Sequence, residues 1–240
     1  PSGWSQTNNS SPIGVSDWFQ GNPAAFTSFN GAADSYIAAN YQNTNGGNIS
    51  NWLFMPTMTN ISNGDFITFY SRIPDGQEWP DRLEVRLSAA GASTNVGATD
   101  VSVGDFTTVL LSINPTLTMG VYPKTWTKFT ATVTGLAAPV NGKFAFRYWV
   151  TDDGSGANGD YIGIDNVVYN KSGGLGTGVW SGGLPGTIFT DALGTVPYTG
   201  TAVNTVYVKP DTTATYSVVM THPNGCVSAP KTINVTVGKG

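Results

Sequence analysis

The stretch Arg82-Leu83-Glu84-Val85-Arg86-Leu87-Ser88 alternates charged or polar side chains with apolar ones. A period of two places the two leucines and the valine on one face of a β-strand and the charged side chains on the other. We predict that the first face packs in a core and that the second faces water. Similar strands, each bounded by turn-forming residues, are predicted at 65–72, 106–113, 126–133 and 143–150.

No helical periodicity separates these strands, so the predicted fold class is all-β, with a jelly-roll β-sandwich first. Apolar residues make up 40% of the 240 residues and aromatic residues 12%, whereas charged residues make up only 11%. The chain is therefore too apolar to be disordered, and it lacks the Leu-, Ala-, Glu- and Lys-rich segments of helical proteins.

The charge and the hydropathy of the chain limit the classes of partner that it can bind. The net charge is −4, and no cluster of Lys and Arg is present to neutralise phosphates, so nucleic acid is excluded as a partner. No apolar run approaches the roughly 18 residues of a membrane helix, so no membrane insertion is predicted. No signal peptide opens the chain, and we expect a fragment of a longer precursor with neighbouring domains.

The sequence offers little for catalysis. Cys226 is the one cysteine and His222 the one histidine; we interpret them as a half-buried thiol and a turn residue. Glu78 and Glu84 are the two glutamates, and they do not form the pair that glycoside hydrolysis uses, although an Asp pair stays formally open. We predict that the protein is not an enzyme.

A change of composition follows Tyr169. Four glycines within 171–178 are typical of a flexible linker. We therefore predict two domains, 1–170 and 171–240, with a small Ig-like β-sandwich as the second. Its predicted strands are 205–208, 215–221 and 232–237.

Five segments of the first domain occur in an order shared with a known family. They are DWFQGNP (17–23), SYIAANY (35–41), ISNWL (49–53), PDRLEVRLS (80–88) and DYIGIDNV (160–167). With them the first 170 residues resemble the choice-of-anchor J domain, a MAM-like jelly roll related to the cleaved-adhesin domains of secreted bacterial surface proteins.

The second domain is similar to the short Ig-like domains appended to such adhesins in Bacteroidetes. The motifs that carry this resemblance are YVKP (207–210), TATY (213–216) and NGC (224–226). In relatives the cysteine of the last motif often has an upstream partner, which this chain lacks. The resemblance implies export and sorting to the cell surface by the type IX route, and it implies no catalytic mechanism.

Asp165 lies in the apolar segment 161–169, where an unpaired carboxylate would cost several kcal/mol to bury. We therefore predict a partner for it. In jelly-roll domains of this kind a carboxylate of the closing strand often meets N-terminal loops around a structural Ca²⁺, and the resemblance adds Asp34 and Asn40 as ligands. The alternatives are a salt bridge to Arg147 or Arg82, or an edge strand that exposes Asp165.

The segment 152–160 superficially resembles a calcium-binding loop. It lacks the bidentate glutamate of an EF-hand and lies between predicted strands rather than helices. We interpret it as a solvated turn.

Aromatic residues suggest a second kind of site, because sugar rings present apolar faces that stack on flat aromatic surfaces. Trp79 lies between two prolines in the loop 74–81, where Asp81 adds a hydrogen-bonding group. Tyr122 and Trp126, near Pro123, are further surface candidates. Three other tryptophans lie in strongly apolar or family-matching segments and are predicted to be structural: Trp18, Trp52 and Trp149.

The predicted function is that of a non-catalytic, adhesin-type binding module at the cell surface, with carbohydrate or another cell-surface component as its ligand and calcium as a structural ion. One alternative is a stalk that only spaces its neighbours. Another is an accessory module of a secreted hydrolase.

Overall fold

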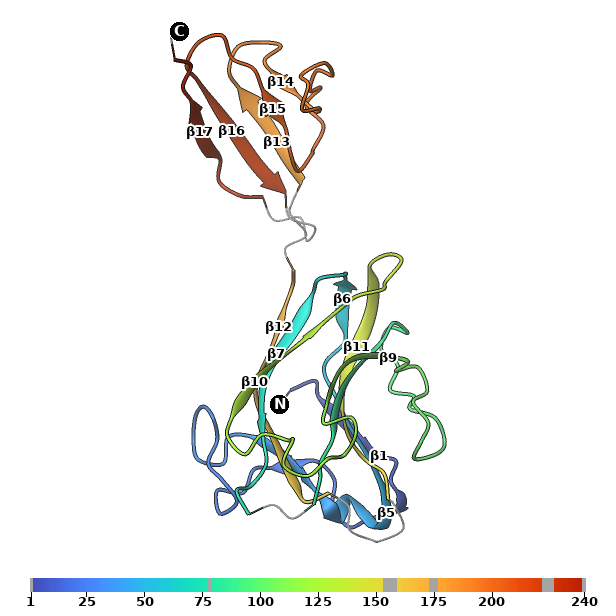
Figure 1. Ribbon diagram of the computed structural model, residues 1–240. Coiled ribbons are helices and arrows are strands. Elements are labelled where there is room, and N and C mark those ends of the chain that lie inside the picture. Colours follow the sequence, from blue (N-terminus) through green and yellow to red (C-terminus); the bar gives the residue numbers. More distant parts are fainter. Residues whose placement is uncertain (1, 77–78, 153–158, 173–176, 222–226, 239–240) are drawn as a thin grey trace. The chain divides into compact units, whose positions relative to one another are not determined.

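The computed structural model describes residues 2–76, 79–152, 159–172, 177–221 and 227–238. The chain divides into two compact units, Pro1–Ser172 and Gly173–Gly240, and the sequence places the division two residues earlier. The predicted all-β fold class is confirmed, since antiparallel sheets make up both units (Figure 1). No helix of the described residues is long and apolar enough to cross a membrane.

Unit 1 is a sandwich of two antiparallel sheets. The first sheet has the order β1-β5-β11-β8-β9, with β2 paired to β5 and β6 paired to β11. Its strands are β1 (Ser5–Asn8), β2 (Ser11–Ile13), β5 (Thr44–Phe54), β6 (Met58–Ile61), β8 (Leu83–Ser88), β9 (Thr108–Ile113) and β11 (Val140–Val150).

The second sheet of unit 1 has the order β10-β7-β12-β4-β3. A 3-10 helix, η1 (Tyr41–Asn43), joins β4 to the first sheet. The strands of the second sheet are β3 (Phe19–Gln20), β4 (Ile37–Asn40), β7 (Phe66–Arg72), β10 (Thr127–Thr132) and β12 (Tyr161–Asn170).

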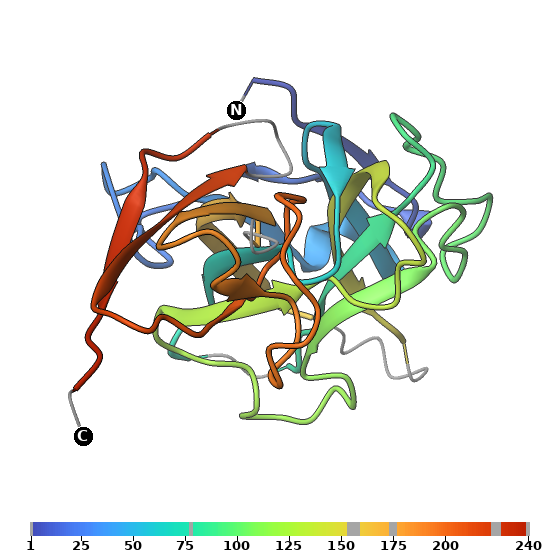
Figure 2. The same cartoon turned by 90° about the horizontal axis from the view of Figure 1, so that it is seen from above.

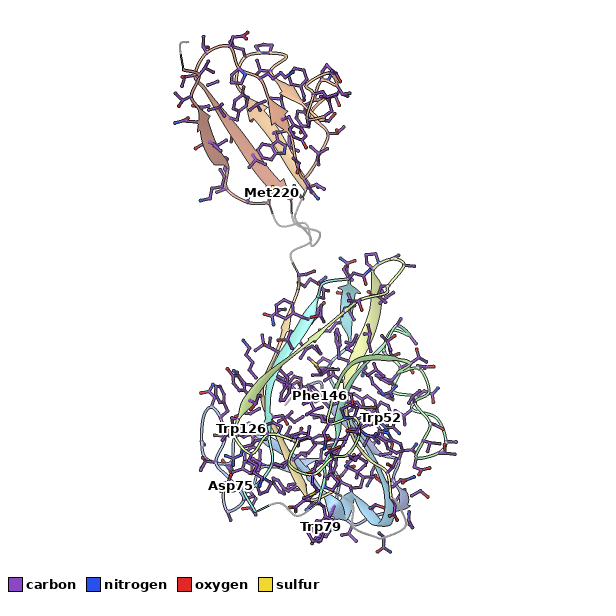
Figure 3. The ribbon with its side chains drawn as sticks, viewed as in Figure 1. Trp52, Asp75, Trp79, Trp126, Phe146 and Met220 are labelled. Carbon is purple, nitrogen blue, oxygen red and sulfur yellow. The ribbon has the colours of Figure 1, made fainter. Side chains whose placement is uncertain are left out.

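The main core lies between the two sheets. Alternate residues of each strand point inward, as the period of two predicts. Phe69 of β7 and Phe146 of β11 meet edge to face across the sandwich, with ring centroids 5.0 Å apart. Figure 3 shows Phe146 in the interior of unit 1. These two rings belong to a buried cluster to which β4 to β12 all contribute.

The outer face of the first sheet is also buried, so the water-facing side predicted for Glu84 and Arg86 is wrong. The segment 89–107 lies against the side of this sheet that faces away from the second sheet (Figures 1 and 2, green). Its Phe106 packs on Trp52, with ring centroids 5.6 Å apart. Glu84 and Arg86 are therefore 7% and 9% exposed, and they form an ion pair at 2.7 Å.

Unit 2 has a three-stranded sheet of order β13-β16-β17 and a separate hairpin of β14 and β15. Tyr216 is the one fully buried apolar side chain among its described residues, and its hydroxyl bonds to Thr187 at 3.0 Å. His222 and Cys226 lie outside the described residues. The strands are β13 (Thr177–Gly182), β14 (Ile188–Phe189), β15 (Tyr207–Val208), β16 (Ala214–Thr221) and β17 (Lys231–Val235).

Candidate functional site

A notch in the second sheet positions the candidate site. β12 pairs with β4 only from Tyr161 to Ile164, whereas on its other side it pairs with β7 as far as Asn170. Among the described residues, the β4 side of β12 has no strand partner beyond Ile164. A β-bulge follows at once, and Asn166 adopts a φ of 51° within it. A short β4 beside a long β12 therefore leaves an opening in the sheet.

A cavity of about 550 Å³ occupies this opening. Trp4, Ile37, Ile164 and Val167 form its apolar wall. The indole of Trp4 also stacks on Phe146, with ring centroids 6.3 Å apart, so the cavity reaches the margin of the core. Its polar wall consists of Gln20, Asp34, Ser35, Asp165 and Asn166.

Asp165 is buried, as predicted, and its partners are backbone groups. Its Oδ2 accepts hydrogen bonds from the backbone N–H groups of Phe29 and Asn30, at 2.9 and 3.0 Å, and its Oδ1 accepts one from the N–H of Asn166 at 2.6 Å. The salt bridges considered for it do not form, because Arg147 pairs with Glu84 and Arg82 donates to backbone carbonyls. The carboxylate thus anchors a loop.

That loop, 22–35, covers the outer face of the second sheet (Figure 1, blue). The ring of Phe29 stacks on Tyr70 at 3.6 Å between centroids, and the ring of Phe26 stacks on Tyr36 at 4.9 Å. Trp126 packs edge-on against Phe26 and donates its indole N–H to the carbonyl of Thr27 at 2.9 Å. These contacts hold the first half of the loop on the sheet, and its last two residues, Asp34 and Ser35, form the rim of the cavity.

The rim carries negative charge. Asp34 accepts a hydrogen bond at Oδ2 from the side-chain amide of Gln20, at 2.7 Å. With Asp165 it places two carboxylates on the wall of the cavity, and no basic side chain is among the residues that line it. The arrangement favours ligands that are uncharged or positively charged.

The predicted calcium ligands are only partly brought together. Asp34 and Asp165 line one cavity, but Asn40 pairs in register with Tyr161, four residues along β12 from Asp165. Its Oδ1 accepts hydrogen bonds from Ser16 Oγ at 2.9 Å and from the N–H of Gln42 at 3.1 Å. The three residues therefore do not fit one coordination sphere.

Elsewhere in the described residues, no three His, Cys, Asp or Glu side chains gather in a group that could hold a metal ion. The segment 153–158, from the superficially EF-hand-like stretch, lies outside the described residues. Calcium binding by this chain stays a prediction.

Calorimetry with and without a chelator tests the calcium prediction. An ion that binds only the folded state, at 100 times its dissociation constant, would add about 2.7 kcal/mol to the free energy of unfolding. If calcium is a structural ion, chelation should lower the melting temperature by the corresponding amount. An unchanged melting temperature would contradict it.

The predicted carbohydrate-contacting residues are placed differently from one another. Trp79 is 39% exposed and lies at the lower end of unit 1 in Figure 3. Trp126 is half-buried in the aromatic packing described above. The surface placement predicted for Asp81 and Tyr122 is wrong, since they are 0% and 2% exposed.

Both buried residues have interior partners. Asp81 accepts hydrogen bonds from the Tyr148 hydroxyl and from the N–H of Asp160, the latter at 2.9 Å. Burial raises the pKa of Asp81 to about 7. The Tyr122 hydroxyl bonds to Ser71 Oγ at 2.6 Å, and burial raises its pKa. Asp81 and Tyr122 were predicted at the surface because they lie close in sequence to loop residues, but their side chains point into the interior.

Of the ten residues that line the cavity, only Asp34 and Asp165 were predicted from the sequence; those it missed include Trp4, Gln20 and Asn166. Gln20 lies in the family-matching segment 17–23, and Asn166 directly follows Asp165, so both were within reach of a sequence argument. Trp4 carries no such signal, because the approach of the N-terminal segment to β12 depends on the sheet order.

No protein-family model matches the chain, and no curated protein matches it. Among solved structures, it is similar to the K1 cleaved adhesin domain of Lys-gingipain from Porphyromonas gingivalis W83, at 20% identity and a TM-score of 0.49, over 72% of this chain and 93% of that one. The chain is also similar to the K3 cleaved adhesin domain of the same protein, at 18% identity and a TM-score of 0.46. This similarity covers 71% of this chain and 92% of that one.

A further similar structure is one of the carbohydrate-binding modules from the β-sandwich superfamily, at 15% identity and a TM-score of 0.41. The similarity covers 70% of this chain and 57% of that one.

Proposed function

We propose that this chain is a non-catalytic, extracellular binding module of the adhesin type, and that it binds a saccharide in the cavity beside β12. The observation that carries the proposal is the composition of the cavity wall, which is apolar on one side and rich in hydrogen-bonding groups on the other. As part of the same proposal, unit 1 is a choice-of-anchor J domain and unit 2 an Ig-like domain.

The size and chemistry of the cavity suit one or two sugar rings. Its volume of about 550 Å³ lies within the roughly 300–1,000 Å³ typical of ligand sites. The apolar C–H face of a sugar would lie against the Trp4 side, and its hydroxyl groups would donate to Asp34 or bond to the exposed Ser35 and Asn166. Two carboxylates on the wall disfavour acidic sugars.

The same geometry supports binding without catalysis. Glycoside hydrolysis needs a pair of carboxyl groups, one of which donates a proton to the leaving oxygen. Both oxygens of Asp165 are engaged by backbone N–H groups of the loop 22–35 and the bulge. Asp165 therefore serves as an anchor of the cavity wall.

A glycan array followed by titration calorimetry tests the proposal. The Asp34→Ala variant should bind the best neutral glycan about tenfold more weakly or worse, because a hydrogen bond to a charged acceptor contributes roughly 1.5–3 kcal/mol. Its melting temperature should stay close to that of the wild type, since Asp34 is only half-buried.

Trp79→Ala is the matched variant, because Trp79 is exposed and is not among the residues that line the cavity. If the ligand instead stacks on Trp79, this variant should lose about 1–3 kcal/mol of binding, by analogy with bases on aromatic rings, while Asp34→Ala binds normally. That outcome would move the site to the loop. A folded wild type that binds no glycan would favour the spacer function.

A further inference from the structure

A second depression in unit 1 lies at η1, which Figure 1 shows at the lower end of the sandwich. It has a volume of about 300 Å³ and shares no lining residue with the cavity beside β12. We call it the η1 groove. Its walls are two chain segments, with Gly14 and Val15 on one and Tyr41, Gln42, Thr44, Asn45 and Gly46 on the other.

Hydrogen bonds hold the two walls together. The backbone N–H of Gly14 donates to the carbonyl of Asn43 at 3.0 Å, and that of Val15 donates to Gln42 at 3.0 Å. Beneath them, the fully buried Asn43 donates its side-chain amide to Ser16 Oγ at 2.9 Å. Asn8 donates to the backbone carbonyls of Ser16 and Asn43, at 3.1 and 2.8 Å. The groove is therefore preorganised, which lowers the entropy cost of binding.

Glycine is required at one wall. A Cβ on Gly14 would lie 2.0 Å from the carbonyl oxygen of Gln42, so the two walls can approach each other only without a side chain there. At the opposite end, Gly46 has a φ of 78° and would place a Cβ in open space. The groove is thus closed at its base and open at its mouth.

Tyr41 presents a flat ring beside this groove. It is 54% exposed, and none of the ring–ring contacts among the described residues includes it. Its backbone N–H donates to the carbonyl of Asp160 at 2.9 Å, and this hydrogen bond fixes the position of the Tyr41 backbone from which the ring projects. An exposed aromatic ring on a fixed backbone is a platform on which an apolar face can stack without a large loss of conformational entropy.

The other lining side chains define the ligand. Gln42 and Asn45 are exposed amides, and Thr44 adds a hydroxyl. No lining residue is charged. Amides that both donate and accept, next to an aromatic ring and without any charge, match the hydroxyl groups and C–H faces of a neutral sugar.

We propose that the η1 groove is a second saccharide site, which binds a neutral sugar through stacking on Tyr41 and hydrogen bonds to Gln42 and Asn45. The ligand class rests on the proposed function, but the site is independent of the cavity beside β12. With two sites on one unit, a multivalent glycan surface is bound more tightly than by either site alone.

The experiment is a titration of the ¹⁵N-labelled full chain with cellotetraose, mannotetraose and N-acetylchitotetraose, followed by amide chemical shifts. We expect at least one of them to shift the amide signals of Gly14, Gln42 and Gly46. Tyr41→Ala should weaken this binding at least tenfold, and Tyr41→Phe, which keeps the ring, should retain it. Tyr207→Ala removes an exposed tyrosine of unit 2 and should change neither binding nor melting.

The results separate the two sites. Shifts confined to Gln20, Asn166 and their neighbours would overturn the η1 site and support the cavity, whereas shifts confined to the groove would support the η1 site and count against the cavity. Groove shifts that survive Tyr41→Ala unchanged would overturn the stacking role. If none of the three saccharides shifts any amide signal, the proposal of the η1 site is wrong, and the glycan array then decides whether the cavity binds a saccharide.

Discussion

Replacing Arg147 with alanine should lower the free energy of unfolding of unit 1 by about 3–5 kcal/mol, because it empties a large buried site and removes one of the two cations beside the buried Glu84 carboxylate. Arg147 is 1% exposed on the outer face of the first sheet. Burial lowers its pKa to about 9, while the nearby Glu84 carboxylate opposes the shift. The guanidinium is therefore charged at neutral pH.

Arg147 connects the first sheet to the segment 89–107 that covers it. Its guanidinium donates to Ser50 Oγ at 3.1 and 2.9 Å and to the backbone carbonyl of Asp100, and it lies 3.6 Å from the Glu84 carboxylate. It also lies over the Trp149 ring, 3.9 Å from the centroid. Without it, Glu84 loses one of two cations and the covering segment loses a tether.

Urea unfolding followed by tryptophan fluorescence measures this effect. Six of the seven tryptophans precede residue 172, so the signal reports mainly on unit 1. Lys128→Ala, on the exposed face of β10, is the control and should change the free energy of unfolding by less than about 0.5 kcal/mol. A similar small change for Arg147→Ala would show that the covering segment is held by its apolar contacts alone.

The strands β7 to β11 were predictable because each carries its own alternation signal, whereas β1 to β6 were not predicted. The predicted strands 65–72 and 82–88 correspond to β7 and β8, and 126–133 corresponds to β10. The alternation of polar and apolar residues does not specify whether the polar face of a strand stays exposed to solvent. Glu84 and Arg86 are buried because the segment 89–107, which directly follows β8, folds back over them, and their charges are compensated by each other in the folded state.

Asp165 shows the same limit for the candidate site. Its burial followed from its apolar neighbours, but two of its three partners are backbone N–H groups more than 130 residues away in sequence. Every residue except proline offers such a group, so no side-chain pattern reveals the pairing. The cavity itself arises from the unequal lengths of β4 and β12, which is a property of sheet order.

The second large effect should appear in the pH dependence of unit 1. Asp81 is fully buried, and burial raises its pKa to about 7, although hydrogen bonds from the Tyr148 hydroxyl and the N–H of Asp160 oppose the shift. In the unfolded chain an aspartate has a pKa of about 3.9. Between about pH 4 and pH 7 the folded state therefore holds a proton at Asp81 that the unfolded state has lost.

This difference in bound protons determines the sign of the change in the free energy of unfolding with pH. Because the folded state binds more protons in that interval, the free energy of unfolding falls as the pH rises from about 4 to about 7. The slope is about 1.4 kcal/mol for each pH unit, which gives a loss on the order of 4 kcal/mol over about three units. Below pH 4 and above pH 7 this group contributes no further change.

Asp81→Asn removes the ionisation, while its amide oxygen can still accept the hydrogen bonds that Oδ1 accepts from the Tyr148 hydroxyl and the Asp160 N–H. The free energies of unfolding of wild type and variant, compared at pH 4.5, 6 and 8, should diverge as the pH rises, with the variant more stable by a few kcal/mol at pH 8. Other titrating groups are common to both proteins and cancel in the difference. A constant difference across this range would mean that Asp81 is ionised in the folded state at pH 4.5, and that Tyr148 and the Asp160 amide already compensate the buried charge.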